Sequence, residues 1–202
     1  DKRREVNDVV EWMDGEQCLI TYKLDGSSAS LVYKNGIFEL AKTRGDGTFG
    51  ENLTAHFRHI RIPTILFAKK WRKLDVEVRG ELCISRNSFS RLSDEMEARG
   101  LGRPNSIRNI VAGLLHKKED LDLCSFLDFF AYDLICDGLG LRMETEKMAL
   151  LKEEGFAIPE NQIATDASSF EQAIQKYQSE LESYGYLTDG LVLSVNNIKK
   201  QL

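Results

Sequence analysis

The dipeptide Asn35-Gly36 separates two segments, 28–33 and 37–44, in which apolar and polar residues roughly alternate. Asn-Gly favours a two-residue hairpin turn, because both turn positions require a positive φ. The alternation indicates strands with one buried face. Another alternating segment, 16–23, precedes a second turn signal, Asp25-Gly26. These features constrain the first part of the chain to strands joined by tight turns.

The rest of the chain mixes strands and helices without a regular βαβ alternation. A glycine-rich loop, "GDGTFGENLT", is followed by a predicted helix with a Thr or Asn cap. The pattern therefore predicts an α+β fold with largely antiparallel sheets. The further predicted strands are 74–84, 125–135 and 190–196, and the predicted helices are about 53–60, 86–99, 105–117, 143–154 and 168–184.

Composition excludes several classes of protein. Hydrophobic residues make up 42% of the 202 residues, which is enough for a sizeable core. No run approaches the roughly 18 apolar residues of a membrane span. The net charge of −5 argues against an autonomous DNA-binding module. If the chain acts on nucleic acid, we expect a local basic patch or further domains.

Four cysteines are scattered along the chain without a CxxC pair or a nearby histidine pair. That spacing argues against zinc and against a disulfide framework. Each cysteine lies in or beside an apolar run, which predicts buried, reduced thiols and a cytoplasmic location. The four are Cys18, Cys83, Cys124 and Cys136.

Four separated motifs place a charged residue at a strand end or beside a glycine turn, where a rigid sheet presents functional side chains. Glycines there allow a phosphate to approach the backbone closely. The residues are Lys23 in "KLDG", Arg44 in "TRGDGTFGE", Glu81 in "VRGE" and Asp189 in "TDGLVL".

With these motifs the chain resembles the adenylation (nucleotidyltransferase) domain of NAD-dependent DNA ligases. "KLDG" is similar to the nucleophile motif of that superfamily, and "TRGDGTFGENLT" resembles a long stretch typical of its NAD-using branch. "EVRGE", "SIRNIVAGLL", "FFAYDL" and "TDGLVLSVN" follow in the family's order and roughly at its spacing. The resemblance covers about residues 16–196 and implies antiparallel sheets flanked by helices, with a nucleotide cleft between the sheets.

The resemblance implies that Lys23 attacks the α-phosphorus of NAD, expels nicotinamide mononucleotide and forms lysyl-AMP. The attacking amine has to be neutral, which requires desolvation or nearby cations. Asp25 and Gly26 are expected to shape the nucleophile turn, and Asp25 to help orient the lysine. A plain β-turn is an equally good interpretation of Asp25-Gly26.

The same resemblance assigns the remaining site residues. Arg44 is expected to contact the nucleotide ribose or phosphate, because a guanidinium matches phosphate oxygens. Glu81 is expected to bind the ribose hydroxyls or a metal, and Tyr132 to stack on the adenine. Arg108 is expected to approach a phosphate or DNA, and Asp189 to lie near the reacting phosphate. Glu81 and Asp189 are the predicted ligands of Mg²⁺.

Three positions depart from the family pattern. Thr21 stands where the family commonly has a glutamate facing the adenine, and we still expect Thr21 to line the nucleotide site. His116 replaces an arginine, and Ser194 replaces a lysine that would face the phosphates. Losing one such cation can cost roughly 2–4 kcal/mol of transition-state stabilisation. Such drift would suit a divergent bacterial or viral ligase.

We expect residues 1–202 to form one adenylation domain, excised from a longer ligase that also has an N-terminal nicotinamide-binding domain and C-terminal DNA-binding domains. Its expected partner is nicked double-stranded DNA, with no membrane and a monomeric state. The fragment alone is expected to bind AMP-like ligands and to react with NAD slowly or not at all.

Two alternatives remain open. One is an ATP- or GTP-dependent nucleotidyltransferase of the RNA ligase or capping type, although these commonly have an arginine where this chain has Ser28. The other is a degenerate homologue that binds a nucleotide without catalysis, although Lys23 and Asp189 are intact.

Overall fold

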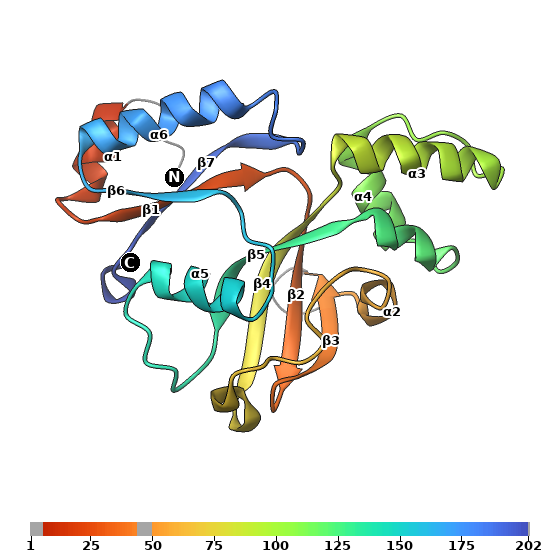
Figure 1. Ribbon diagram of the computed structural model, residues 1–202, viewed down its shortest axis with the longest axis horizontal. Helices are drawn as coiled ribbons and strands as arrows, with labels where there is room; N and C mark the ends of the chain where they lie inside the picture. The colour runs from red at the N-terminus through yellow and green to blue at the C-terminus, as the bar shows by residue number, and fades with distance from the viewer. Residues whose placement is uncertain (1–5, 44–49, 202) are drawn as a thin grey trace.

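The computed structural model describes residues 6–43 and 50–201 (Figure 1). Its strands form two antiparallel sheets, one of three strands in the order β6-β1-β7 and one of four in the order β3-β2-β4-β5. The strands are β1 (Cys18–Leu24), β2 (Ser27–Lys34), β3 (Ile37–Thr43), β4 (Asp75–Cys83), β5 (Asp128–Ile135), β6 (Asn161–Ala164) and β7 (Thr188–Val195).

Helices cover the outer faces of these sheets, so the predicted α+β class with antiparallel sheets is confirmed. The α-helices are α1 (Val6–Met13), α2 (Thr54–Phe57), α3 (Arg86–Ala98), α4 (Ile107–Leu115), α5 (Glu144–Glu153) and α6 (Ala167–Glu180). The short 3₁₀ helices are η1 (Lys69–Lys73), η2 (Leu121–Phe126) and η3 (Ile198–Lys200).

The Asn35-Gly36 hairpin is confirmed. Asn35 has φ 52° and Gly36 has φ 79°, the positive values that a type I′ turn requires. β2 and β3 pair on either side of this turn.

The plain β-turn interpretation of Asp25-Gly26 is wrong. β1 pairs with β6 and β7, whereas β2 pairs with β3 and β4, so the segment carries the chain from one sheet to the other. A Cβ on Gly26 would lie 2.0 Å from the carbonyl oxygen of Leu82. The glycine is needed because β4 passes directly against this crossing.

The two sheets rest on cores of different size. One face of the four-stranded sheet packs on α2, α3, α4 and α5 through a large cluster that includes the buried Trp71, Leu92 and Leu114. The three-stranded sheet packs on α1 and α6 through a small cluster around Ile20 and Phe170. A third, small cluster joins the two sheets: Leu24 of β1 packs with Cys83 and Phe130 of the four-stranded sheet.

Several boundaries differ from the predictions for local reasons. α2 ends at Phe57, well short of residue 60, and its N-cap Leu53 provides no side-chain cap. β5 begins only at Asp128 because residues 121–126 form η2. α1 and β6 were not predicted, because the first is short and charged and the second has only four residues.

Cys18, Cys83 and Cys124 are buried and free, as predicted, whereas Cys136 is only partly buried. Burial raises the pKa of Cys124 to about 11. None of the described helices is long and apolar enough to cross a membrane.

Candidate functional site

Lys23 lies beside an irregularity in the pairing of β1 with β7. Lys23 pairs with Gly190 but Leu24 pairs with Thr188, so Asp189 is an extra residue in β7. Bulges of this kind redirect a side chain and are common beside active sites. Gly190 has φ 142°, a value that a side chain disfavours. The result is that Lys23 Nζ lies 3.0 Å from Asp189 Oδ2.

Arg108, in the first turn of α4, joins this pair to the crossing between the sheets. Its Nη2 lies 3.1 Å from Asp189 Oδ1, the other oxygen of the carboxylate that Lys23 contacts. Its Nε donates to Asp25 Oδ2 at 2.7 Å. Lys23, Asp25, Arg108 and Asp189 thus form a charge cluster whose formal charges sum to zero. Three of the sequence motifs meet in it.

The contacts within the cluster shift the pKa values of Asp189 and Arg108. The hydrogen bond from Lys23 holds the pKa of Asp189 below its ordinary value, and the charge of Arg108 acts in the same direction. The hydrogen bond to Asp25 raises the pKa of Arg108. At neutral pH, Asp189 is therefore ionised.

The cluster is open to solvent: 51% of the Lys23 side chain and 40% of the Asp189 side chain are exposed. A neutral Lys23 amine was expected to need either desolvation or a nearby cation. Desolvation is incomplete in this chain, because half of the Lys23 side chain is exposed. Arg108 brings a second cation close to Lys23, because both side chains contact the carboxylate of Asp189. Exclusion of water from Lys23 is left to whatever ligand binds there.

Glu81 on β4 is the third acidic residue of the site, after Asp25 and Asp189. Its Oε2 accepts a hydrogen bond from Ser28 Oγ at 2.8 Å, and Ser28 is its direct partner on β2. Burial raises the pKa of Glu81, while hydrogen bonds from Ser28 and from the backbone of Gly26 oppose that shift. Glu81 is thereby tied to the turn that follows Lys23.

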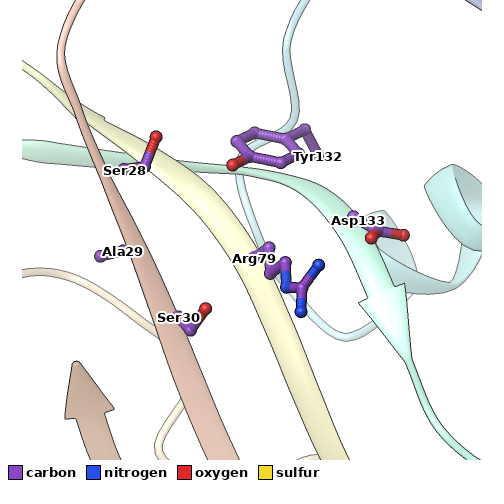
Figure 2. Close-up of a pocket in the computed structure, with 6 residues that line it drawn as sticks. All are labelled: Ser28, Ala29, Ser30, Arg79, Tyr132 and Asp133. Carbon is purple, nitrogen blue, oxygen red and sulfur yellow. The ribbon is translucent and has the colours of Figure 1, made fainter. Parts of the chain in front are cut away.

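Tyr132 lines a pocket of about 140 Å³ on the open face of the four-stranded sheet. Figure 2 shows its ring lying along this face, with the hydroxyl end directed toward β2. Phe129 and Phe130, its neighbours in the aromatic strand, are buried in the cores instead. Tyr132, by contrast, is only partly buried and faces the pocket, so it is not a core residue.

Sequence reasoning did not single out Arg79 and Asp133 for the pocket, and it noted Ser28 only as a departure from another family. Arg79 Nε lies 2.9 Å from Glu77 Oε1, and Asp133 Oδ1 lies 2.8 Å from Lys147 Nζ. The period of two along β4, which puts Arg79 on the same side as Glu81, could have identified Arg79.

Two other predicted positions lie on the sheet that carries Lys23. Thr21 is two residues before Lys23 on β1, so the two side chains share one face of the strand. Its partner on β7 is Val192, whose side chain is exposed. Ser194, which replaces the expected lysine, follows two residues later on that same face. Arg44 lies outside the described residues.

His116 does not join the charge cluster. It is the C-cap residue of α4, and its Nδ1 lies 3.4 Å from Glu51 Oε2. Both side chains are largely exposed. His116 therefore contacts Glu51 at the surface and does not direct a cation at the charge cluster.

Within the described ranges, no group of three or more His, Cys, Asp or Glu side chains is placed to hold a metal ion. Glu81 and Asp189 nevertheless supply the carboxylate oxygens that Mg²⁺ prefers. Because Mg²⁺ usually combines one or two carboxylates with water and substrate phosphates, this donor set fits a metal that binds together with a nucleotide.

Known proteins resemble this chain in sequence and in fold. The sequence profile of the family described as the NAD-dependent DNA ligase adenylation domain matches residues 3–202. A DNA ligase of Acetivibrio thermocellus is 32% identical over 202 residues, which cover 98% of this chain and 29% of that protein. A DNA ligase of Limosilactobacillus reuteri is 33% identical over 184 residues, covering 89% of this chain and 26% of that protein. The chain thus spans less than a third of these relatives.

Among solved structures, an archaeal ATP-dependent RNA ligase matches with a TM-score of 0.59. The match covers 100% of this chain and 46% of that chain at 15% sequence identity. At this identity the likeness concerns the fold alone.

Proposed function

Because the chain belongs to the NAD-dependent DNA ligase adenylation domain family, we propose that Lys23 captures the adenylyl group of NAD as lysyl-AMP. The observation that carries this proposal is the charge cluster, in which the Lys23 amine is 3.0 Å from Asp189 and Arg108 contacts the same carboxylate. A nucleophile next to a carboxylate, with a cation beside both, is the arrangement that phosphoryl-group transfer needs.

In the proposed step, Lys23 Nζ forms a bond to the α-phosphorus and the bond from that phosphorus to nicotinamide mononucleotide breaks. The amine has to lose a proton on the way. Asp189 Oδ2 is within hydrogen-bond distance and is ionised at neutral pH, so Asp189 is the group placed to hold that proton. Asp25 keeps Arg108 in position, because it accepts a hydrogen bond from Nε.

The remaining residues are proposed to bind the nucleotide. Tyr132 would provide a flat ring for the adenine, and Glu81 would accept from the ribose hydroxyls. Arg108 would transfer its terminal nitrogen from Asp189 to the phosphate while its Nε stays bound to Asp25. Thr21 and Arg44 complete the proposed contacts.

Mg²⁺ is proposed to be held by Glu81 and Asp189 together with the phosphates. When bound it would neutralise charge on the phosphate oxygens. The bound Mg²⁺ would supply part of the positive charge that the lysine of the family pattern provides and that Ser194 lacks.

The acceptor is proposed to be nicked DNA, because the similar proteins named above are DNA ligases. The AMP would pass from Lys23 to the 5′-phosphate at the nick, and the 3′-hydroxyl would then displace AMP to join the strands. We place this activity in the cytoplasm of a bacterial or viral system, with the chain acting as a monomer in replication or repair.

The experiment supplies the chain with radiolabelled NAD and Mg²⁺ in parallel with labelled ATP, and it follows label bound to protein. Excess nucleotide and incubation over hours are used because we expect the chain by itself to react slowly. Label from NAD, with release of nicotinamide mononucleotide, supports the proposal.

Label from ATP but not from NAD would favour the ATP-dependent alternative. No label from either nucleotide, in the chain and also in the longer ligase expected to contain it, would favour the degenerate alternative. The control is Lys23→Ala, which removes the nucleophile and should leave no labelled protein. Because Lys23 is half exposed, this variant should fold normally.

A further inference from the structure

A basic and aromatic turn protrudes at the end of the four-stranded sheet farthest from the charge cluster. Phe67 is 79% exposed, and Lys69, Lys70, Arg72 and Lys73 are all exposed. We call these five residues the distal basic loop. In Figure 1 the turn that contains η1 lies at the foot of the sheet, beyond the β2–β3 hairpin.

The four cations of this loop form no ion pair with a described carboxylate, although the buried Glu154 lies beneath the loop and Lys70 Nζ lies 4.9 Å from the centre of the Trp71 ring. Within residues 6–43 and 50–201, no acidic side chain forms an ion pair with any of the four. The nearby acids act elsewhere: Glu39 pairs with Lys34 at 2.8 Å, and the charge of Asp75 also acts on Lys34. On a chain of net charge −5, four unpaired cations within five residues are a strong local concentration of positive charge.

The loop is held rigidly, although its tip is exposed. Glu154, which is buried, accepts hydrogen bonds from the backbone N–H of Phe67 and Ala68 and from the indole of Trp71. Trp71 itself is almost fully buried, and the backbone N–H of Leu66 donates to Gly36 O at 2.8 Å. A buried carboxylate is costly unless it is hydrogen-bonded. The hydrogen bonds that Glu154 needs are therefore maintained, and they hold the backbone at Phe67 in place.

From these contacts we infer that the distal basic loop binds the phosphodiester backbone of DNA beside the nick. The inference rests on the proposed function, because it takes nicked DNA as the substrate. Interfaces with DNA are more positively charged than interfaces between proteins, whose buried centres are depleted in lysine. An exposed aromatic ring among cations is also typical of surfaces that contact nucleic acid. The loop is the local basic patch that an acidic chain needs for such a partner.

The position of the loop sets where on the DNA it acts. Ser28, the partner of Glu81, is six residues from Lys34 along β2, which corresponds to about 20 Å at roughly 3.3 Å per residue. Phosphates of one strand are about 3.4 Å apart along the helix axis. With the duplex axis along β2, which the inference takes as its geometry, the loop contacts phosphates about six nucleotides from the nick.

The experiment measures binding of the chain to a fluorescent nicked duplex with long arms over a series of salt concentrations. The variant is Lys69→Gln with Lys73→Gln, which removes two exposed charges without touching Trp71. Each lost phosphate contact lowers the slope of log K against log salt by about 0.9. We expect the double variant to lower the slope by about 1.8, and Phe67→Ala to weaken binding without changing the slope.

The matched control is Lys176→Gln with Lys199→Gln, which changes the net charge equally on the side of the three-stranded sheet. It should retain the wild-type slope. Cutting one arm of the duplex to about five base pairs should abolish the difference between wild type and the Lys69/Lys73 variant, given the distance estimated above. The inference is overturned if the two double variants behave alike, if arm length has no effect, or if the chain shows no salt-dependent binding.

The outcome is separable from that of the proposed function. Lys69 and Lys73 lie outside the charge cluster, so their double variant should form lysyl-AMP at the wild-type rate. Normal lysyl-AMP formation with an unchanged salt slope would overturn the inference alone. A changed slope in a chain that never forms lysyl-AMP would overturn the proposed function alone.

Discussion

The charge cluster and the distal basic loop place charge in opposite ways. In the cluster, each of the four charged side chains contacts a partner of opposite sign, and three segments far apart in sequence supply them: 23–25, Arg108 and Asp189. In the distal basic loop, four cations from one short segment lie without acidic partners in the described chain, on a backbone that Glu154 fixes.

The difference indicates two uses of charge. Paired charges at short distance hold one another in a defined geometry, and a phosphate can later exchange with a carboxylate partner. Unpaired cations create a field that reaches about 10 Å at moderate salt and attracts a polyanion. The first arrangement suits chemistry at one atom, and the second suits binding along an extended ligand.

The largest effect is expected from Asp189→Asn, which keeps the shape of the side chain but removes its charge and its ability to hold the Lys23 proton. General acid–base groups contribute about 10²- to 10⁴-fold to rate. Single-turnover formation of lysyl-AMP should fall by that factor, while salt-dependent DNA binding should stay unchanged. A rate within twofold of wild type would remove Asp189 from the proposed proton transfer.

The next effect is expected from Arg108→Ala, compared with Arg108→Lys. Loss of one donor to a developing phosphate charge costs about 10²- to 10³-fold. Lysine restores the charge but not the planar fork that spans Asp25 and Asp189, so only partial recovery is expected. If lysine restored the full rate of lysyl-AMP formation, the two-carboxylate geometry of Arg108 would be irrelevant.

A smaller effect, on stability, is expected from Glu154→Gln. An amide replaces a buried carboxylate that accepts three hydrogen bonds, and an unsatisfied buried group costs about 1–3 kcal/mol. Calorimetry should show the melting temperature lowered by about 2–4 °C for each kcal/mol. Lysyl-AMP formation at a temperature well below melting should not change, because Glu154 lies at the other end of the sheet.

The smallest effect is expected in the pH dependence of stability. The folded-state pKa of Asp189 is lowered, chiefly by Lys23. Its contribution is therefore present above its unfolded pKa of about 3.9 and is lost as the pH falls through the lower folded value. Since 40% of the side chain is exposed, the contribution is below about 1 kcal/mol.

Urea unfolding of wild type and Asp189→Asn at pH 6 and pH 3 measures this contribution. The difference in unfolding free energy between the two proteins should shrink toward the lower pH. A difference that grows as the pH falls would contradict the assigned direction of the shift.

Much of the fold could be predicted because its signals are local. The Asn35-Gly36 turn, the alternation in β4 and the aromatic run in β5 each depend on neighbouring residues. The crossing at Asp25-Gly26 could not be predicted, since a turn residue does not show whether the next strand joins the same sheet. Only the packing of Leu82 against Gly26 decides that.

The site shows the same division. Lys23, Asp25, Arg108 and Asp189 could be named from motifs, but the bulge that brings Asp189 to Lys23 depends on a register shift between distant strands. The distal basic loop carries no motif. Its exposure depends on Glu154, which is more than eighty residues away in sequence.

The central claim is that the Lys23 amine receives the adenylyl group. Tandem mass spectrometry of the chain after incubation with NAD and Mg²⁺ locates the adduct directly. The account predicts AMP on Lys23 and none on Lys42 or Lys147, the lysines whose ion pairs lie beside the pocket. AMP on another residue, or equal labelling in Lys23→Ala, would contradict it.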